Sequence, residues 1–567
     1  MTPNETPSGT RHELPALVTG LPAILIVFVC SGLPLIWMAG AVIFASPAVR
    51  AELHINAFRA QLLARTLAYN GLAAVLATLM GLPAAFVLGR GRGVVARLMW
   101  VVLPAALLMP SLSYAYGWSQ AARLLRVFLQ NHIGTEFVQR FGLTFAPAGP
   151  ADTLRCIGSL AGWLWAVPAV LVGLSLRRMD SSIQQQALLD GGLLRVTLRQ
   201  LLPSIIASVA IVTIIATQEF AVYEPTGISV VATEVRMVFD TGAVSSADNP
   251  IAGPVLTGLG TKSPDQPARA AAAVATAMPL VLVTFLLAIL VGWAASRSSA
   301  AETITIPTWP PVLDCSLWTM LLTIALVLVN IGIPVAALLR SLQEPLSVGR
   351  MWVTFEPQVI GAVLVAAIAA TVAAVAGFSA AGRWTRGLLL ATAATFLVGG
   401  QLLAIADIRI YNRPGLIWAY DYFPAPVFAY FGRFGWLALA AGRGTWTRPW
   451  QELREMASLD GASTLRTATG VVWPLAWPLL LAGGLMVGAL SMTEVPATVL
   501  LFPQNPQVLT PTLMTWVHMA RYDPMIEASV LMMAVVLIPA VASVLLAALS
   551  LRLVRRLADQ RLNRDTA

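Results

Sequence analysis

The residues of this chain that could carry out covalent chemistry or bind a metal are few and scattered. Neither the cysteines nor the histidines have the spacing of metal ligands, and no C-x-x-C pair occurs; these residues are Cys30, Cys156, Cys315, His12, His54, His132 and His518. We interpret the cysteines as isolated apolar thiols. The loops contain no nucleophile, general base or metal cluster that could form a catalytic site, so we expect no enzymatic activity and no cofactor bound by this chain.

The segment nearest to a phosphate-binding loop is Gly258-Leu259-Gly260-Thr261-Lys262-Ser263. A Walker sequence requires Gly-Lys-Ser/Thr, with another glycine upstream at a fixed offset from the first of these three. Thr261 stands where that sequence needs the glycine before the lysine. We therefore interpret the segment as an ordinary loop, and we expect no metal or nucleotide site in this chain.

Two polar stretches, far apart along the chain, share an unusual pattern. Each has an Asp-Gly pair and, further along, a proline that we expect to open a long apolar helix. The first runs from Gln185-Gln186-Ala187-Leu188-Leu189-Asp190-Gly191 to Pro203, and the second from Glu455-Met456-Ala457-Ser458-Leu459-Asp460-Gly461-Ala462 to Pro474. A glutamate close to a proline follows each glycine at the same sequence distance, Glu224 in one copy and Glu494 in the other. Matching landmarks at both ends of the unit indicate an internal duplication, which is common in transporters.

The composition places these stretches in a membrane protein. Hydrophobic residues make up 57% of the chain, charged residues only 11%, and the mean hydropathy is +0.76, values that do not fit a soluble domain. Backbone groups inside lipid need partners from their own segment, so the expected elements are helices of roughly 17 to 25 residues. We predict about twelve spans: 22–44, 66–88, 98–118, 157–176, 204–222, 271–293, 317–339, 359–380, 388–405, 424–441, 474–492 and 529–551.

The spans divide into two sets of six. The segment 295–316 is rich in Ser, Thr and Pro and is typical of a linker. We therefore expect an all-α integral membrane protein of two homologous six-helix halves. The first transmembrane domain would cover residues 1–300 and the second residues 301–567.

Arginine predicts the orientation, because short cytoplasmic loops hold the positive excess. With the N-terminus inside, both Asp-Gly loops and both termini face the cytoplasm. The arginines that support this orientation are Arg90, Arg92, Arg97, Arg177, Arg178, Arg195, Arg199, Arg383, Arg386, Arg552, Arg555, Arg556, Arg561 and Arg564. The net charge of +9 lies mostly beside apolar spans, which favours lipid headgroups or a cytoplasmic partner over nucleic acid. Residues 1–14 lack the features of a cleaved signal peptide.

The second polar stretch resembles a known motif. Glu455 to Pro474 is similar to the EAA loop of the membrane subunits of ATP-binding-cassette importers, with matches at Glu455, Ala457, Asp460, Gly461, Ala462, Val471, Trp473 and Pro474. The first copy departs from the motif at Gln185 and Gln186, where the family has Glu and Ala, and its interval from glycine to proline is slightly shorter. Over its whole length the chain resembles the fused permeases of ferric-iron importers, with thiamine and polyamine permeases as relatives. The segments Ser491-Met492-Thr493-Glu494-Val495-Pro496 and Pro511-Thr512-Leu513-Met514 carry the likeness to the iron branch.

This resemblance implies a type I importer fold, a separate ATPase dimer on the cytoplasmic side, and a periplasmic solute-binding protein outside. The protein would lie in the inner membrane, and the partner subunit would use the ATP. Each loop would form a short helix that seats in a groove of the ATPase. Ala187 and Ala457 would leave little side chain between helix and groove, and the glycines Gly191 and Gly461 would permit a turn or a close approach.

The remaining expectations concern the flanking residues of each loop. Asp190 and Asp460 could accept backbone N–H bonds at the start of the next helix, and Pro203 and Pro474 could begin the membrane helix. Glu455 would pair with a basic residue of the ATPase, whereas Gln185 could only form hydrogen bonds.

Glu224 and Glu494 could line the outer mouth and contact the binding protein or a cation. The main alternative is an ion-coupled secondary transporter, for which buried acids such as Glu219 and Glu494 are the candidates, with Asp407 and Arg409 near a span end. A membrane enzyme or an assembly scaffold is a third possibility.

Overall fold

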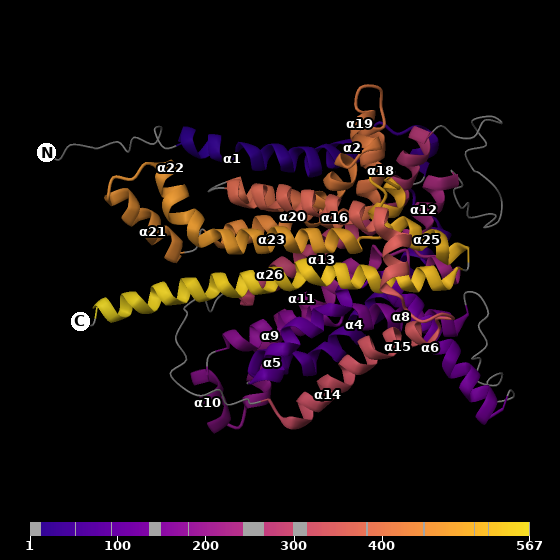
Figure 1. Ribbon diagram of the computed structural model, residues 1–567, viewed down its shortest axis with the longest axis horizontal. Coiled ribbons are helices and arrows are strands. Elements are labelled where there is room, and N and C mark those ends of the chain that lie inside the picture. Colours follow the sequence, from indigo (N-terminus) through magenta and orange to yellow (C-terminus); the bar gives the residue numbers. More distant parts are fainter. Residues whose placement is uncertain are drawn as a thin grey trace. The chain divides into compact units, whose positions relative to one another are not determined.

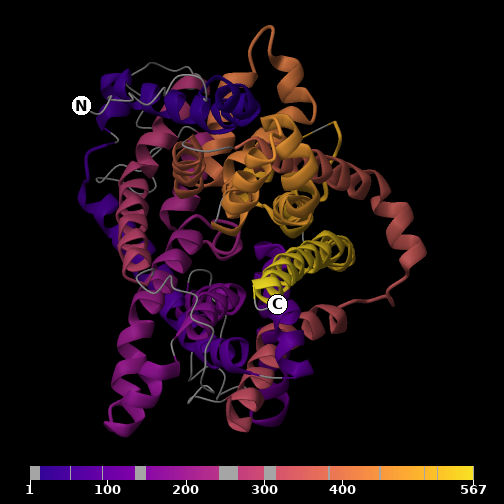
Figure 2. The same ribbon diagram turned by 90° about the vertical axis from the view of Figure 1, so that its left-hand side faces the viewer.

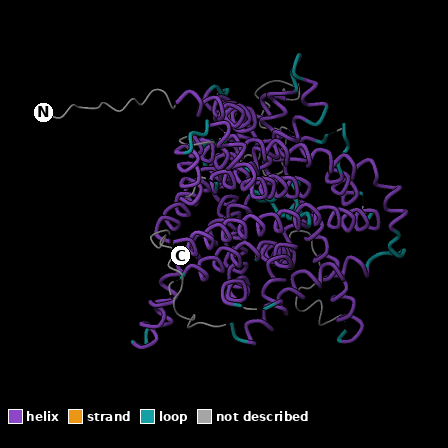
Figure 3. Tube along the Cα trace, turned by 60° about the vertical axis from the view of Figure 1, so that its left-hand side comes forward, coloured by secondary structure: helices purple, strands orange, loops and turns teal. Residues whose placement is uncertain are grey.

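The described part of the chain is helical. The computed structural model describes residues 13–51, 53–91, 93–134, 149–179, 181–241, 266–298, 315–380, 384–445, 448–503, 505–519 and 521–565. In these residues helices are joined by turns and loops, and no β-strand forms (Figures 1 and 3). The expected all-α fold is therefore confirmed for the described residues.

Nine helical segments of the described residues are long and apolar enough to cross a membrane. They are Gly20–Ile43, Ala57–Arg90, Pro150–Arg178, Leu193–Thr217, Pro267–Arg297, Leu317–Arg340, Val348–Ser379, Thr469–Thr493 and Tyr522–Ser550. Two sharply bent helix pairs bring the number to eleven if each pair is one span. These segments indicate a multi-pass membrane protein.

The predicted spans 98–118 and 388–405 are not single helices, which corrects the sequence prediction. The elements concerned are α5 (Val94–Val102), η2 (Leu103–Leu108) and α6 (Ser111–His132) in the first case, and α17 (Trp384–Val398) and α18 (Gly400–Tyr411) in the second. The bends are 91° and 103°. Pro110 disfavours helix at the residue before it, and Gly399 has a φ of +98°, which favours glycine. Hydropathy is unaffected by either break, so the apolar pattern could not reveal it.

Two compact units can be distinguished, and each is described by itself. Unit 1 comprises Met1–Ala39, Pro357–Val508 and Ala534–Ala567, and unit 2 comprises Gly40–Glu356 and Leu509–Met533. Each unit thus combines segments of both predicted domains. The predicted boundary at residue 300 lies outside the described residues and stays a prediction.

Unit 1 is built around helices from the second part of the chain. Its elements are α1 (Glu13–Val27), η1 (Phe28–Gly32), α17, α18, α19 (Ile417–Asp421), α20 (Pro424–Gly444), α21 (Arg448–Leu459), α22 (Thr464–Thr467), η7 (Ala468–Val472), α23 (Trp473–Thr493) and α24 (Pro496–Leu501). It shares α2 (Leu33–Ile43), α16 (Val348–Ser379) and α26 (Tyr522–Asp565) with unit 2. Figure 2 shows α26 nearly end-on. The predicted span 424–441 forms α20, which is not among the candidate spans; Gly432 and Arg433 interrupt its apolar pattern.

Unit 2 is built mainly from the first part of the chain. Its elements are α3 (Pro47–Ala51), α4 (Ala57–Arg90), α5, η2, α6, α8 (Pro150–Leu164), α9 (Ala166–Arg178), α10 (Ser181–Leu189), α11 (Leu193–Thr217), η3 (Glu224–Thr226), α12 (Val231–Thr241), α13 (Gln266–Ser298), α14 (Leu317–Val327), η6 (Leu328–Gly332), α15 (Ile333–Arg340) and α25 (Leu509–His518). The helices α14 and α15 follow the predicted linker but pack in this unit, against α4 and α6.

Besides η7, a π-helical turn ahead of α23 in unit 1, one π-helical turn interrupts a long helix in each unit. These turns are η1 in unit 1 and η6 in unit 2, and each is followed by a proline, Pro34 or Pro334. Proline has no N–H for the carbonyl four residues earlier, which belongs to Cys30 or Asn330, so the helix widens at that point. The sequence around each turn has the form Val-x-x-Gly-x-Pro, with one copy in each unit.

A glycine of the same unit lies against each π-helical turn. In unit 2 a Cβ on Gly162 would lie 2.5 Å from Asn330 Oδ1 and 2.6 Å from the Tyr114 hydroxyl, which donates to the Asn330 carbonyl at 2.7 Å. In unit 1 a Cβ on Gly432 would lie 2.6 Å from the Cys30 carbonyl oxygen. The sequence interval from Gly162 to Gly432 equals the interval between the two Asp-Gly glycines. Both positions require glycine because the facing helix comes so close.

Candidate functional site

The two Asp-Gly stretches each form a short helix, a tight turn and a second helix. In unit 2, α10 precedes the turn at Asp190–Gly192 and α11 follows it. In unit 1, α21 precedes the turn at Asp460–Gly461, and α22 follows. Within unit 2, α10 lies at the end opposite α6 and α12, and within unit 1, α21 and α22 lie at the end opposite α18 and α19 (Figure 1).

The backbone hydrogen bonds of the two turns match residue for residue. In the first, the Asp190, Gly191 and Gly192 amides donate to the carbonyls of Gln186, Leu188 and Ala187 at 3.0, 3.2 and 2.8 Å. In the second, the Asp460, Gly461 and Ala462 amides donate to the carbonyls of Met456, Ser458 and Ala457 at 3.0, 3.1 and 2.9 Å. This pattern is the Schellman motif, which ends a helix on a left-handed residue.

The central glycines have the conformation that this motif requires. Gly191 has a φ of +70° and Gly461 a φ of +77°. A Cβ at either position would have no neighbour within 4 Å among the described residues. Of the two roles proposed for these glycines, the turn is therefore supported here, whereas a close approach within the described chain is not.

The side chains around the turns are arranged differently from the prediction. Ala187 and Ala457 are only 6% and 7% exposed, so they pack against their own chain rather than leaving room for a partner groove. The most exposed apolar side chains of the two stretches are instead Leu189 and Leu459, at 87% and 86%. Sequence reasoning missed these leucines. The signal that could have found them is an apolar residue directly before Asp-Gly in an otherwise polar stretch.

The prediction that a proline begins the following helix is wrong for Pro203 and holds in part for Pro474. Pro203 lies inside α11, which begins at Leu193, because a proline deep in an apolar helix can be tolerated where neighbouring groups satisfy the freed carbonyl. Pro474 lies in the first turn of α23, but the helical path already begins at α22 and continues through η7.

The aspartates do not cap these helices. The N-cap of α11 is Gly192, without a side-chain cap, and the Ser463 hydroxyl accepts the Arg466 amide at 3.4 Å before α22. Asp190 and Asp460 are exposed, because the Schellman turn places the N-cap after the glycine. Glu455 is exposed and Gln185 is partly buried.

Glu224, at η3 in unit 2, sits in a small ionic cluster. Its carboxylate pairs with Arg236 of α12 and lies 3.7 Å from His518 Nε2 of α25, and its side chain is 24% exposed. Burial raises the pKa of Glu224, and the nearby Arg236 guanidinium opposes that rise. The cluster lies at the end of unit 2 opposite α10. In the predicted orientation, this is the outer end.

Glu494, the other predicted mouth residue, is buried inside unit 1. Its side chain is 5% exposed, and its Oε2 lies 3.8 Å from Nε of Arg433 on α20. Its Oε1 adjoins Gly400, where a Cβ would overlap it. A role for Glu494 in contacting solvent or a binding protein is therefore not supported by this structure.

The acid that corresponds to Glu494 by its place in the fold is Glu219, not Glu224. Glu494 directly follows the last residue of α23, and Glu219 is the second residue after α11. Glu219 is 4% exposed and accepts a hydrogen bond of 2.8 Å from the Ser111 hydroxyl, at the start of α6. Glu494 lies beside Gly400, at the start of α18. Counting residues from the glycine paired the wrong acids, because the two stretches differ in length.

Asp407 is the most unusual acid in the described residues. It is 0% exposed, and neither carboxylate oxygen has a hydrogen-bond partner there. Leu403 and Tyr411, one turn to either side on α18, face η1: Leu403 adjoins Gly432, and the Tyr411 hydroxyl donates to the Val29 carbonyl at 3.3 Å. Asp407 thus lies on the face that packs against the π-helical turn. Its neighbour Arg409 is partly buried.

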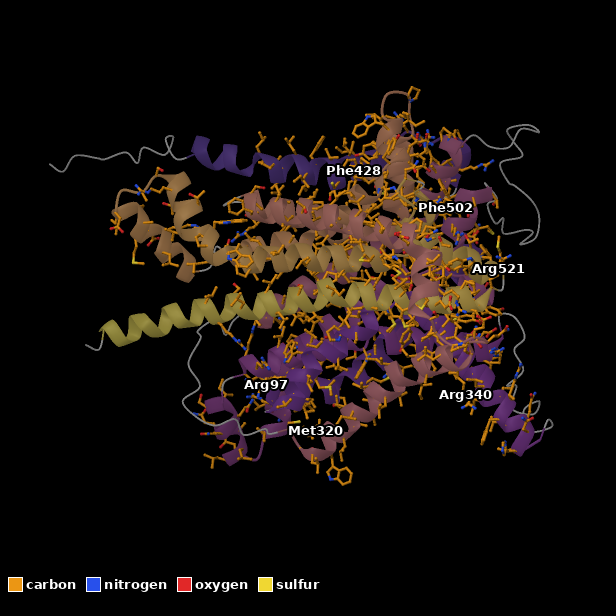
Figure 4. All side chains as sticks on the ribbon, in the orientation of Figure 1. Arg97, Met320, Arg340, Phe428, Phe502 and Arg521 are labelled. Atoms are coloured by element: carbon orange, nitrogen blue, oxygen red, sulfur yellow. The ribbon has the colours of Figure 1, made fainter. Side chains whose placement is uncertain are left out.

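The arginines of unit 2 lie at both of its ends. Arg97 lies toward the end that carries α10, whereas Arg340 lies at the opposite end (Figure 4). The first placement agrees with the predicted cytoplasmic arginines. The orientation itself stays a prediction.

The described residues contain no group of three or more His, Cys, Asp or Glu side chains that could hold a metal. Cys30 and Cys156 are buried and Cys315 is partly exposed, and all three are free thiols. The loop Gly258–Ser263 lies outside the described residues. Comparisons with protein-family models, curated proteins and solved structures gave no match to this chain.

Proposed function

We propose that this chain is the membrane permease of an ATP-binding-cassette importer. It has two homologous halves of six spans each, residues 1–300 and 301–567, and about twelve spans in all. It lies in the inner membrane with both termini in the cytoplasm. A separate ATPase dimer binds on the cytoplasmic side and hydrolyses ATP, and a periplasmic solute-binding protein delivers the solute.

The observation that carries this proposal is the pair of matching Schellman turns. Each turn ends a short helix and leads into a candidate span, and each exposes a leucine, Leu189 or Leu459, almost completely. A partner subunit that covered these leucines would gain apolar contact area. The two exposed leucines would give each subunit of an ATPase dimer one apolar contact.

Further support comes from residue spacings that recur away from the turns. The glycines Gly162 and Gly432 have the same spacing as the turn glycines, and both lie against a π-helical turn. Such agreement between distant landmarks is expected of a duplicated permease.

In the proposed mechanism each turn transmits movement of the ATPase to the helix that follows it. The turn of unit 2 leads through α11, and that of unit 1 through α22, η7 and α23. Both helices end at buried acids beside bent spans. The proposed lever, meaning the element that transmits the movement, is therefore a continuous helical path rather than a helix that begins at a proline.

The solute is proposed on the resemblance alone. Ferric iron is the first choice, and thiamine, a polyamine or another small solute is the alternative. Uptake assays with the cognate binding protein would decide between them.

The function is tested by reconstituting the chain in liposomes with its ATPase and binding protein. The reading frames beside its gene should encode both. We expect solute uptake to depend on ATP, and Leu459→Ser and Leu189→Ser each to weaken ATPase docking and lower stimulated hydrolysis by about tenfold. The control is Leu416→Ser, at a leucine that is 43% exposed at the opposite end of unit 1. Unchanged hydrolysis in both turn variants would contradict the proposal.

A second candidate is an ion-coupled carrier, favoured by the buried acid Asp407. Buried ionisable groups in membrane helices commonly mark ion pathways. Uptake without any ATPase, driven by an ion gradient and abolished in Asp407→Asn, would support this candidate over the importer.

A further inference from the structure

A buried ion pair lies across the bend of the broken span in unit 1, beside a hydrogen bond of 2.6 Å from the Thr395 hydroxyl to the Gly432 carbonyl. At the bend, α17 ends at Val398 and α18 begins at Gly400. Such a break leaves carbonyls unpaired on one side and amides on the other. Arg433 and Glu494 meet these two sides from different helices.

Arg433 serves the carbonyl side of the break. Its Nη1 donates to the Phe396 carbonyl at 2.9 Å, and its guanidinium lies 5.0 Å from the centre of the Phe396 ring. The side chain is 3% exposed. Arginine suits this place because its planar group can donate to a carbonyl, stack on a ring and face a carboxylate at once.

Glu494 serves the amide side. Its Oε1 adjoins Gly400, the first residue of α18, and accepts from the Ala497 amide at 3.4 Å. A carboxylate is favoured at a helix N-terminus, where the amides and the helix dipole are positive. Its other oxygen lies 3.8 Å from Arg433 Nε.

Both residues stand at the far end of the proposed lever. Glu494 directly follows α23, whose helical path runs back through η7 and α22 to the Gly461 turn. Movement of that turn would reach Glu494 along this continuous helical path. The ion pair then joins the far end of α23 to the bend and to α20.

Unit 2 has the same arrangement without the opposite charges. Trp163 directly follows Gly162, just as Arg433 directly follows Gly432, so the two side chains occupy matching positions. Trp163 donates its indole N–H to the Met109 carbonyl at 3.1 Å, just before the break ahead of α6. Glu219 accepts from Ser111 at the start of α6. The two breaks are therefore bridged at the same places, by Arg433 and Glu494 in unit 1 and by Trp163 and Glu219 in unit 2.

We infer that Arg433 and Glu494 are a positioning pair that makes the bent span α17–α18 move together with α23, so that the turn at Gly461 controls the position of this span. This inference rests on the proposed function. It assigns the stronger mechanical link to unit 1, because separating two buried opposite charges is costly. The bent span is the moving element, and the ion pair carries the movement to it.

The test uses the full chain with its ATPase and binding protein in liposomes, and measures solute transported per ATP hydrolysed. Arg433→Met and Glu494→Gln should each lower this ratio at least about tenfold, while the complex still assembles and hydrolyses ATP. Arg433→Lys, which keeps the charge, should restore part of the ratio. The matched variant Trp163→Phe in unit 2 should lower it less.

Hydrogen exchange on the purified chain gives a second readout that does not need the ATPase. In Glu494→Gln and in the double variant Arg433→Met/Glu494→Gln, exchange should rise together at the start of α18 and the end of α23. The double variant removes both charges and leaves no unpaired buried charge. It can therefore be measured even if a single variant fails to fold.

The inference is overturned if the parent protein couples transport to ATP and the variants keep its ratio, or if exchange at α18 and α23 is unchanged. A parent that transports without an ATPase would instead overturn the proposed function, and the exchange data would still decide whether the pair holds the bend.

Discussion

The two glycine turns are nearly identical, whereas the acids at the far ends of the helices that follow them are held differently. The turns share three backbone hydrogen bonds, similar positive φ values and equally exposed leucines. Beyond the helices, Glu494 faces an arginine and Glu219 faces a serine hydroxyl. The turn is set by its own few residues, but the setting of each acid depends on helices that are distant in sequence.

The largest effect should come from breaking the ion pair. Removing one partner leaves a buried charge, so Arg433→Met should lower the free energy of unfolding by about 3 to 5 kcal/mol. Glu219→Gln, in the other unit, should cost only about 1 to 2 kcal/mol, because it replaces one acceptor of a hydrogen bond. Thermal unfolding in detergent would measure both. Equal losses would contradict the contrast drawn between the two units.

A smaller effect is expected where the glycines approach the π-helical turns. Gly162→Ala and Gly432→Ala each add a methyl group to a space that is already occupied, at a cost of about 1 to 3 kcal/mol. The loss should be larger for Gly432→Ala, because its Cβ would meet a backbone carbonyl, whereas the Cβ at Gly162 would meet side-chain ends of Asn330 and Tyr114 that can shift. Gly158→Ala, where a Cβ has no neighbour within 4 Å, is the control and should be nearly neutral or stabilising. Unchanged stability in both Gly162→Ala and Gly432→Ala would contradict the claim that the two units share this close approach.

The glycine turns themselves should tolerate substitution slightly better. Gly461→Val and Gly191→Val place a branched side chain in the left-handed region, which costs about 1 to 2 kcal/mol. Because the two turns share one geometry, their losses in stability should agree within the error of thermal unfolding. Loss of ATPase binding should be greater for Gly461→Val, since only the second stretch carries Glu455. A clear difference in stability would show that the turns are less alike than their hydrogen bonds indicate.

The smallest effect is predicted for Asp407→Asn. The carboxyl group has no hydrogen-bond partner in the described residues, so removing its charge should leave the free energy of unfolding unchanged or raise it slightly. ATP-dependent uptake should also persist. Loss of uptake with intact folding would favour the ion-coupled carrier instead.

The sequence predicted the helical fold and the turns, because both depend on local composition. Long apolar runs require helices in lipid, and an Asp-Gly pair after a short helix predicts a left-handed turn. The bends ahead of Ser111 and Gly400 were not predicted, because a break does not change hydropathy. The π-helical turns η1 and η6 were not predicted either, although each falls in a Val-x-x-Gly-x-Pro segment.

The candidate site was predicted only in part. The turn glycines were placed correctly, while the faces of the short helices were not: Ala187 and Ala457 turn inward and Leu189 and Leu459 outward. The side facing solvent depends on how a short helix rests on its own unit, which is set by residues distant in sequence. The pairing of Glu224 with Glu494 failed for a related reason, because equal residue counts do not give equal positions when the helices differ in length.

The most direct test of the central claim is cross-linking from the exposed leucines. Leu189→Cys and Leu459→Cys, each in a chain with Cys315→Ser, would be combined with the ATPase in membranes and treated with a short cross-linker that joins the cysteine thiol to a lysine amine of a partner; Leu416→Cys is the control. The account predicts that both turn cysteines form a product with the ATPase and that the control does not. Absence of any product from both turns, in a preparation that still imports solute, would contradict the claim that the two glycine turns seat the ATPase.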